Sequence, residues 1–175
     1  MRALTMASIA LATAMAPATT VAQHEHEEAR PALTGGYAPR LGELMILQQI
    51  RHSKLWFAVA ANNWELAEHG LYELKAGFAD VTRIYPNAYG VTFEPVVAAL
   101  NAGELAELAK AIVAQDRVRF TIAFDQLTAA CNACHQVTNH AFIVIQQPIS
   151  PPFNNQSFGP PGGQAPPPGG GGHPH

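Results

Sequence analysis

Residues 41–83, LGELMILQQIRHSKLWFAVAANNWELAEHGLYELKAGFADVTR, determine the kind of fold that this chain can adopt. Apolar side chains recur here at the three- and four-residue intervals of an amphipathic helix, so the sequence predicts helices over Leu41–Ala61 and Trp64–Arg83. Asn62-Asn63 ends the first helix and can cap the second, with Glu65 three residues after Asn62 as in a capping box. Because the joint is so short, the two helices are expected to be antiparallel neighbours.

A third helix is expected after a loop over Ile84–Glu94, which contains the turn-forming residues Pro86 and Gly90. Pro95 is suited to the start of a helix, and a helical apolar pattern continues to Gln115. Gly103 weakens this pattern, so the regular part can begin as late as Glu104.

Asp116 can cap a fourth helix. The apolar seam of this helix contains Phe120, Phe124, Leu127, Cys131, Cys134 and Thr138. We expect the helix to end between Asn139 and Gln147, because Pro148 cannot continue it. No strand-like alternation is evident, so residues 41–147 predict an all-α fold, an antiparallel up-down-up-down four-helix bundle.

The two ends of the sequence have compositions of their own. Residues 1–22 begin with a positive charge, continue as an apolar run and end in small residues, as in a cleaved secretory signal peptide; an uncleaved anchor is the alternative. We therefore expect a protein that is exported to an oxidising compartment, with no integral membrane segment after cleavage. Residues 23–40 are expected to form a flexible lead-in.

Pro148–His175 holds 9 of the 14 prolines and 7 of the 14 glycines and contains no Asp, Glu, Lys or Arg. Such a composition is typical of a disordered Pro/Gly-rich tail. In its first part, Ile149, Phe153 and Phe158 are candidates to fold back against the helices.

The segment Cys131-Asn132-Ala133-Cys134-His135 is a CxxCH motif and contains the only two cysteines. Two thiols at this spacing can add to the vinyl groups of haem, and the adjacent imidazole can then bind the iron. A thioredoxin-like redox pair would lie in a βαβ context, and a zinc site would need further ligands close by. We interpret the motif as the attachment site of one haem c, with a CxxC disulfide or another metal site as the alternatives.

A CxxCH motif near the end of the last helix of a four-helix bundle resembles the class II c-type cytochromes, the cytochrome c-prime family. The resemblance covers Leu41–His140 and implies a periplasmic mono-haem protein. In some members a methionine on the first helix is the sixth iron ligand, and these look like electron carriers; in others an open distal site binds nitric oxide or carbon monoxide. The chain departs from the family in having Leu41, not Arg, one turn before Met45, and in the forty residues after the motif.

Met45 is the predicted distal ligand. The motif lies 15 to 19 residues after the start of the fourth helix, so the facing level on an antiparallel first helix is Gly42–Ile46, which contains Met45. His52 shares the same stripe but lies roughly 10 Å nearer the joint, so the two cannot both bind one iron. Two alternatives to Met45 as distal ligand remain: His52, or an open distal site lined by Leu41, Leu44 and Met45.

Charge and composition exclude several function classes. The chain has 10 Lys and Arg against 13 Asp and Glu, a net charge of −3, with no basic cluster for nucleic acid. No paired carboxylates or nucleophile–base set indicate an enzyme. With Met45 as the sixth ligand, the resemblance implies an electron-transfer protein that acts with redox partner proteins. The alternatives are a five-coordinate haem protein that binds small gases, or a helical interaction module with a disulfide. Apolar outer positions on the first two helices would permit a homodimer.

Overall fold

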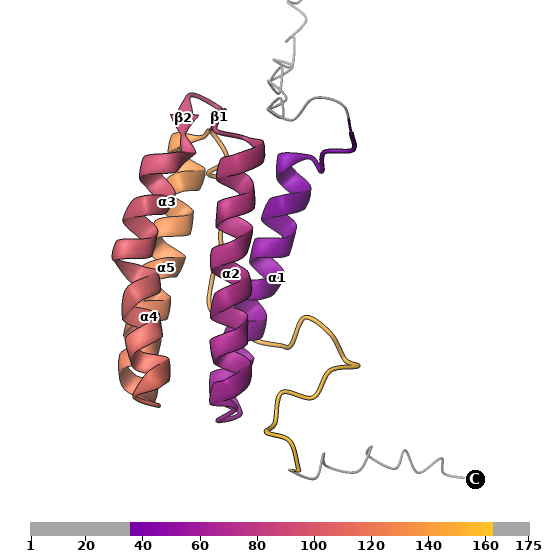
Figure 1. The fold of residues 1–175 in the computed structure, drawn as a ribbon, viewed down its shortest axis with the longest axis vertical. Coiled ribbons are helices and arrows are strands. Elements are labelled where there is room, and N and C mark those ends of the chain that lie inside the picture. The colour runs from indigo at the N-terminus through magenta and orange to yellow at the C-terminus, as the bar shows by residue number, and fades with distance from the viewer. Residues whose placement is uncertain (1–35, 163–175) are drawn as a thin grey trace, which may run out of the picture.

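The computed structural model describes residues 36–162, so the predicted signal peptide and most of the lead-in lie outside the described residues, as do residues 163–175. The described part is mostly helical, with one small sheet (Figure 1). Its elements are α1 (Leu41–Ala60), α2 (Trp64–Ile84), β1 (Asn87–Ala88), β2 (Val91–Thr92), α3 (Phe93–Ala102), α4 (Glu104–Val113) and α5 (Arg117–Val137). The prediction of a helical protein is confirmed at this level.

The first two helices form as predicted, but the cap between them is displaced by one residue. Asn63, not Asn62, is the N-cap of α2, and its side chain accepts a hydrogen bond from the Leu66 N–H at 3.1 Å. Asn62 has a φ of 57°, in the left-handed region that asparagine tolerates better than most residues. The predicted capping box from Asn62 and Glu65 is therefore wrong.

The predicted loop over residues 84–94 contains a short antiparallel hairpin. Strands β1 and β2 pair Asn87 with Thr92 and Ala88 with Val91. Tyr89 and Gly90 between them both have positive φ, 50° and 75°, as a two-residue type I′ turn requires. The two strands are too short to show an alternating apolar pattern, so the sequence does not predict them. The expectation of an all-α chain is therefore corrected to a mostly helical one.

The third predicted helix is divided in two, and the fourth is shorter than predicted. Gly103 separates α3 from α4, with a φ of −99° and a ψ of −103° that interrupt the helix. Asp116 caps α5 as predicted, because its side chain accepts the Arg119 N–H at 2.9 Å. The helix ends at Val137, before the predicted range of Asn139 to Gln147, because Asn139 adopts a φ of 61° and the chain reverses there.

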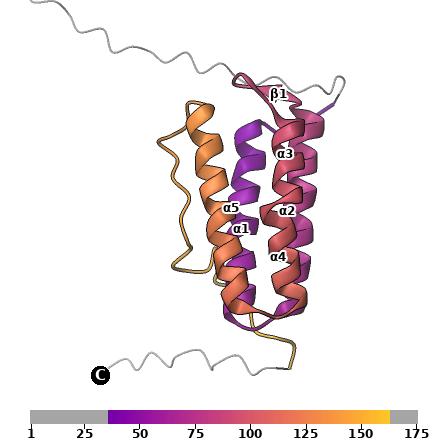
Figure 2. The ribbon, with the colours of Figure 1, turned by 90° about the vertical axis from the view of Figure 1, so that its left-hand side faces the viewer.

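The helices lie alongside one another, with α1 against α2, α2 against α3 and α4, and α4 against α5 (Figures 1 and 2). The Arg117 guanidinium, at the start of α5, donates to the Val59 and Ala60 carbonyls at 3.2 and 3.1 Å and to Asn62 Oδ1 at 2.7 Å. The C-terminal end of α1 and the N-terminal end of α5 therefore lie at the same end of the molecule. The start of α1 consequently faces the far end of α5, where the CxxCH motif lies.

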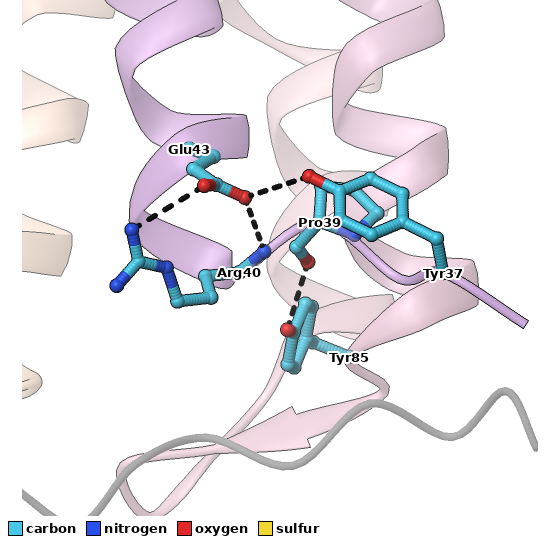
Figure 3. A network of polar contacts seen from close by, with 5 residues as sticks. All are labelled: Tyr37, Pro39, Arg40, Glu43 and Tyr85. Atoms are coloured by element: carbon cyan, nitrogen blue, oxygen red, sulfur yellow. Dashed lines mark hydrogen bonds and ion pairs between the residues drawn. The ribbon is translucent and has the colours of Figure 1, made fainter.

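The start of α1 is held against the end of α2 by a network of polar contacts (Figure 3). The Tyr85 hydroxyl donates to the Pro39 carbonyl at 2.9 Å, and the Arg40 N–H donates to Glu43 Oε2 at 2.8 Å. The Tyr37 hydroxyl donates to the same Glu43 oxygen at 3.3 Å. These bonds fix the first turn of α1, on which Leu41 and Leu44 are buried and Met45 is partly buried.

Residues 141–159, which we call the return segment, run back beside α5 toward its N-terminal end (Figure 2). The far end of the segment is attached. Phe158 is buried with its ring centroid 5.7 Å from that of Phe57, and Asn63 Nδ2 donates to the Gly159 carbonyl at 3.0 Å. Ile149 and Phe153 are exposed, so Phe158 alone of the three candidate residues packs on the helices. The predicted tail therefore returns to the helices at Phe158 and Gly159, as was expected of Phe158.

Candidate haem attachment site

The two cysteines lie one helical turn apart near the C-terminal end of α5, as free and partly buried thiols. Cys131 packs against the larger core cluster, which includes Leu55 and Phe124. Cys134 packs against a smaller cluster that includes Leu41 and Leu44. The two thiols therefore pack on the two different core clusters, Cys131 on the larger and Cys134 on the smaller.

The acidity of the thiols differs from that of a reactive redox pair. Burial, together with the nearby Cys134, raises the pKa of Cys131 to about 11, and burial also raises the pKa of Cys134. Redox-active CxxC motifs have lowered thiol pKa values, because the thiolate is the reactive form. Both thiols here stay protonated near neutral pH, which disfavours a thioredoxin-like activity.

His135 follows Cys134 directly and is oriented by the return segment. Its Nδ1 atom lies 2.8 Å from the Ile143 carbonyl oxygen. A carbonyl only accepts, so in the neutral ring Nδ1 carries the proton and Nε2 keeps its lone pair. Metal-binding histidines commonly donate their second ring N–H to a carbonyl in this way. Two thiols one turn apart, followed by an imidazole with Nε2 free to bind iron, fit a covalently attached haem.

Asn132, between the two cysteines, contacts the same segment. Its Nδ2 donates to the Ile145 carbonyl at 2.9 Å, and its Oδ1 accepts the Ile145 N–H at 2.8 Å. In the CxxCH pattern Asn132 is only a spacer, and the pattern gives His135 no hydrogen-bond partner. The available signal was an asparagine inside a helix, where its side chain commonly hydrogen-bonds to backbone.

No family model, curated protein or solved structure matches this chain. Within residues 36–162, no three His, Cys, Asp or Glu side chains gather as a metal site would require. None of the helices in the same range combines the length and the apolar character needed to cross a membrane. The function of the site is therefore inferred from the side chains of the CxxCH motif on α5 and from those of α1 that face this helix.

Met45 lies at the level that the antiparallel arrangement predicts. It is partly buried and packs against the same small cluster as Cys134. Leu41 and Leu44, named with it for an open distal site, are buried members of that cluster. The structure thus brings Met45, Leu41 and Leu44 to the end of the molecule where the motif lies; that Met45 binds the iron stays a prediction.

His52 lies farther from the motif and is occupied by core contacts. Its ring stacks on Phe124 at 4.1 Å between centroids, and its Nε2 lies 2.9 Å from Thr128 Oγ1. The Thr128 hydroxyl donates its hydrogen to the Phe124 carbonyl, so it accepts from His52 Nε2. Thr128 precedes His135 by seven residues, or roughly 10 Å along the helix. The geometry therefore favours a structural role for His52 over a ligand role.

Acidification is expected to destabilise the protein through His52. Burial lowers the pKa of His52 from 6.5 to about 4, so below pH 6.5 the unfolded chain binds a proton that the folded chain does not. The free energy of unfolding should fall by about 2 kcal/mol between pH 7 and pH 5 from this group, with the loss complete near pH 4. Urea unfolding of the wild type and of His52→Leu at pH 7 and pH 5 measures this fall in the free energy of unfolding. Equal losses in the two proteins would contradict the assignment.

Proposed function

We propose that this protein is a periplasmic mono-haem c-type cytochrome that transfers electrons. The proposed architecture is an antiparallel up-down-up-down four-helix bundle, in which α3 and α4 together form the third helix. One observation carries the proposal: His135 donates from Nδ1 to the Ile143 carbonyl at 2.8 Å, directly after two free thiols one turn apart. That combination suits covalent haem attachment better than a disulfide or zinc site.

The residues have distinct proposed roles. Cys131 and Cys134 would hold the haem through thioether bonds, and His135 would bind the iron through Nε2. Met45 would be the distal ligand, on a first turn of α1 that the Arg40–Glu43 and Tyr85–Pro39 bonds hold in place. The haem, when bound, supplies a centre that gains and loses one electron, and methionine ligation raises its reduction potential. The chain's part is to exclude water from the distal side with Leu41 and Leu44 and to hold both ligands still.

Met45 is the only methionine outside the predicted signal peptide, so its replacement gives a clean test. The oxidised wild type, produced in a periplasm with cytochrome c maturation, is expected to show a weak near-infrared sulfur-to-iron band. Met45→Ala should lose this band completely and become high-spin. Ile46→Ala, at the exposed neighbouring position, should keep it.

Other spectra would support other functions. A wild type that is already high-spin, and whose reduced spectrum sharpens on addition of carbon monoxide, would favour the gas-binding alternative, with Leu41 and Leu44 as the apolar distal wall. A protein without haem, with Cys131 and Cys134 joined in a disulfide, would contradict both haem functions and favour the helical interaction module.

A further inference from the structure

We infer that Asn132 is a positioning residue for His135: it holds the return segment so that the Ile143 carbonyl stays within hydrogen-bonding distance of the imidazole. The inference rests on the proposed function, since it concerns a ligand of the haem iron. Asn132 and His135 lie within one turn of α5, and they bind Ile145 and Ile143, two residues apart on the return segment. The Asn132 amide makes two hydrogen bonds with the Ile145 backbone, one as donor and one as acceptor, like those between paired β-strands.

Few other contacts hold the segment at this point; the Phe142 ring lies 5.7 Å from that of His140, which itself lies 4.7 Å from the Tyr89 ring. Phe142 and Val144, on either side of Ile143, are 71% and 73% exposed, so apolar burial contributes little there. Two backbone bonds close the turn after α5, from His140 N–H to the His135 carbonyl at 2.7 Å and from Ile143 N–H to the His140 carbonyl at 2.8 Å. Both act on the N-terminal side of the Ile143 carbonyl.

On the C-terminal side, the first bonds to the helix are those of Asn132 with Ile145. The next is an exposed bond from Gln147 Nε2 to Asp125 Oδ1 at 2.6 Å. The buried anchor at Phe158 is thirteen residues farther along the segment than Ile145. Without Asn132, the nearest remaining hydrogen bond on the C-terminal side is that of Gln147, four residues after Ile143, so the His135 bond competes with water.

The bond matters for the chemistry of the ligand. An imidazole that donates its N–H to a fixed carbonyl is a more basic metal ligand and is held in one ring orientation. A more basic ligand stabilises the oxidised, more positively charged iron. Loss of the bond should therefore raise the reduction potential, although neither Asn132 nor Ile143 contacts the iron.

The test compares two full-length haem-loaded variants. Asn132→Ala removes both bonds to Ile145 and leaves α5 intact, because alanine is the better helix former. Gln147→Ala is the matched control, because it removes a bond of the same segment that does not reach Ile143. Asn132→Asp is a graded variant, because it keeps the acceptor for the Ile145 N–H and loses the donor.

The first readout is NMR hydrogen exchange of the His135 Nδ1–H in the reduced protein, which is diamagnetic when His135 and Met45 both bind the iron; a wild type that is high-spin is measured as its carbon monoxide complex instead. Exchange should be about tenfold faster in Asn132→Ala than in the wild type, which corresponds to the loss of one hydrogen bond. Gln147→Ala should be unchanged and Asn132→Asp intermediate. The second readout is the reduction potential, which should rise in Asn132→Ala and stay unchanged in Gln147→Ala; Asn132→Asp is compared by exchange alone, because its added negative charge itself lowers the potential.

The outcomes separate the inference from the proposed function. If the wild type carries haem but Asn132→Ala and Gln147→Ala show the same exchange rate and potential, the inference is wrong and the proposed function stands. If Asn132→Ala loses thermal stability without any change in exchange or potential, Asn132 is merely structural and the inference is again wrong. If the wild type carries no haem, both fail together.

Discussion

Replacement of both Cys131 and Cys134 by serine is expected to leave a protein with no covalently bound haem. A serine hydroxyl forms no thioether with a haem vinyl group, so the attachment should be lost completely rather than weakened. The mass of the denatured protein reports this directly, because the wild type should be heavier than its mature chain by one haem and the double variant should not. Each single variant should retain at most one of the two bonds.

Asn132→Ala is the matched control for this experiment, because it changes the same turn of α5 and keeps both thiols. It should retain the full haem mass. Serine at both positions should also fold, since the two thiols are only partly buried. A wild-type mass that equals the mature chain less two hydrogens would indicate a disulfide and contradict the haem assignment.

Phe124→Ala is expected to destabilise the protein severely, and more than any of the other substitutions. The side chain is fully buried in the larger cluster, and its ring stacks on His52 and lies 5.0 Å from Trp56 and 5.6 Å from Phe120 between centroids. Truncation at such a site leaves a cavity between α1 and α5. The free energy of unfolding is expected to fall by about 3–5 kcal/mol. Urea unfolding followed by circular dichroism measures the free energy of unfolding.

Ile122→Ala, on the same helix, serves as its control. Ile122 is 56% exposed, so its truncation should change the free energy of unfolding by no more than about 0.5 kcal/mol. A loss of less than about 1 kcal/mol in Phe124→Ala would mean that α1 and α5 do not share a packed core at this level. It would also contradict the packing of His52 on α1 against Phe124 and Thr128 on α5.

The helices were predictable because each has a seam of apolar residues at helical spacing, and because Asp116 and the Asn62-Asn63 joint mark their limits. The details that failed depend on backbone conformations that side-chain patterns do not show. Tyr89 closes the β-hairpin at a φ of 50°, although tyrosine is not a typical residue for that position. Asn139 ends α5 early for a similar reason, at a φ of 61°.

In the candidate site, the features that depend on local spacing were predictable, and those that depend on contacts with distant residues were not. Cys131, Cys134 and His135 were predictable because their chemistry depends on spacing within one helical turn. The Ile143 carbonyl and the Asn132–Ile145 bonds were not, because they require the uncharged segment after α5 to turn back beside that helix. Met45 is intermediate, because its level follows from counting residues along antiparallel helices, whereas the proposed bond to iron does not.

The attachment of the return segment at Phe158 and Gly159 determines how the molecule can be mounted on a surface. Gly159 is bonded to Asn63, which lies beside the start of α5, whereas His135 lies eighteen residues farther along that helix, or roughly 27 Å away. An affinity handle fixed just after Gly159 would therefore tether the protein by the end opposite its cysteines. On an electrode, such a tether would turn the cysteine end toward the solution, so under the proposed function a soluble partner would reach the haem end and direct transfer to the electrode would be slow.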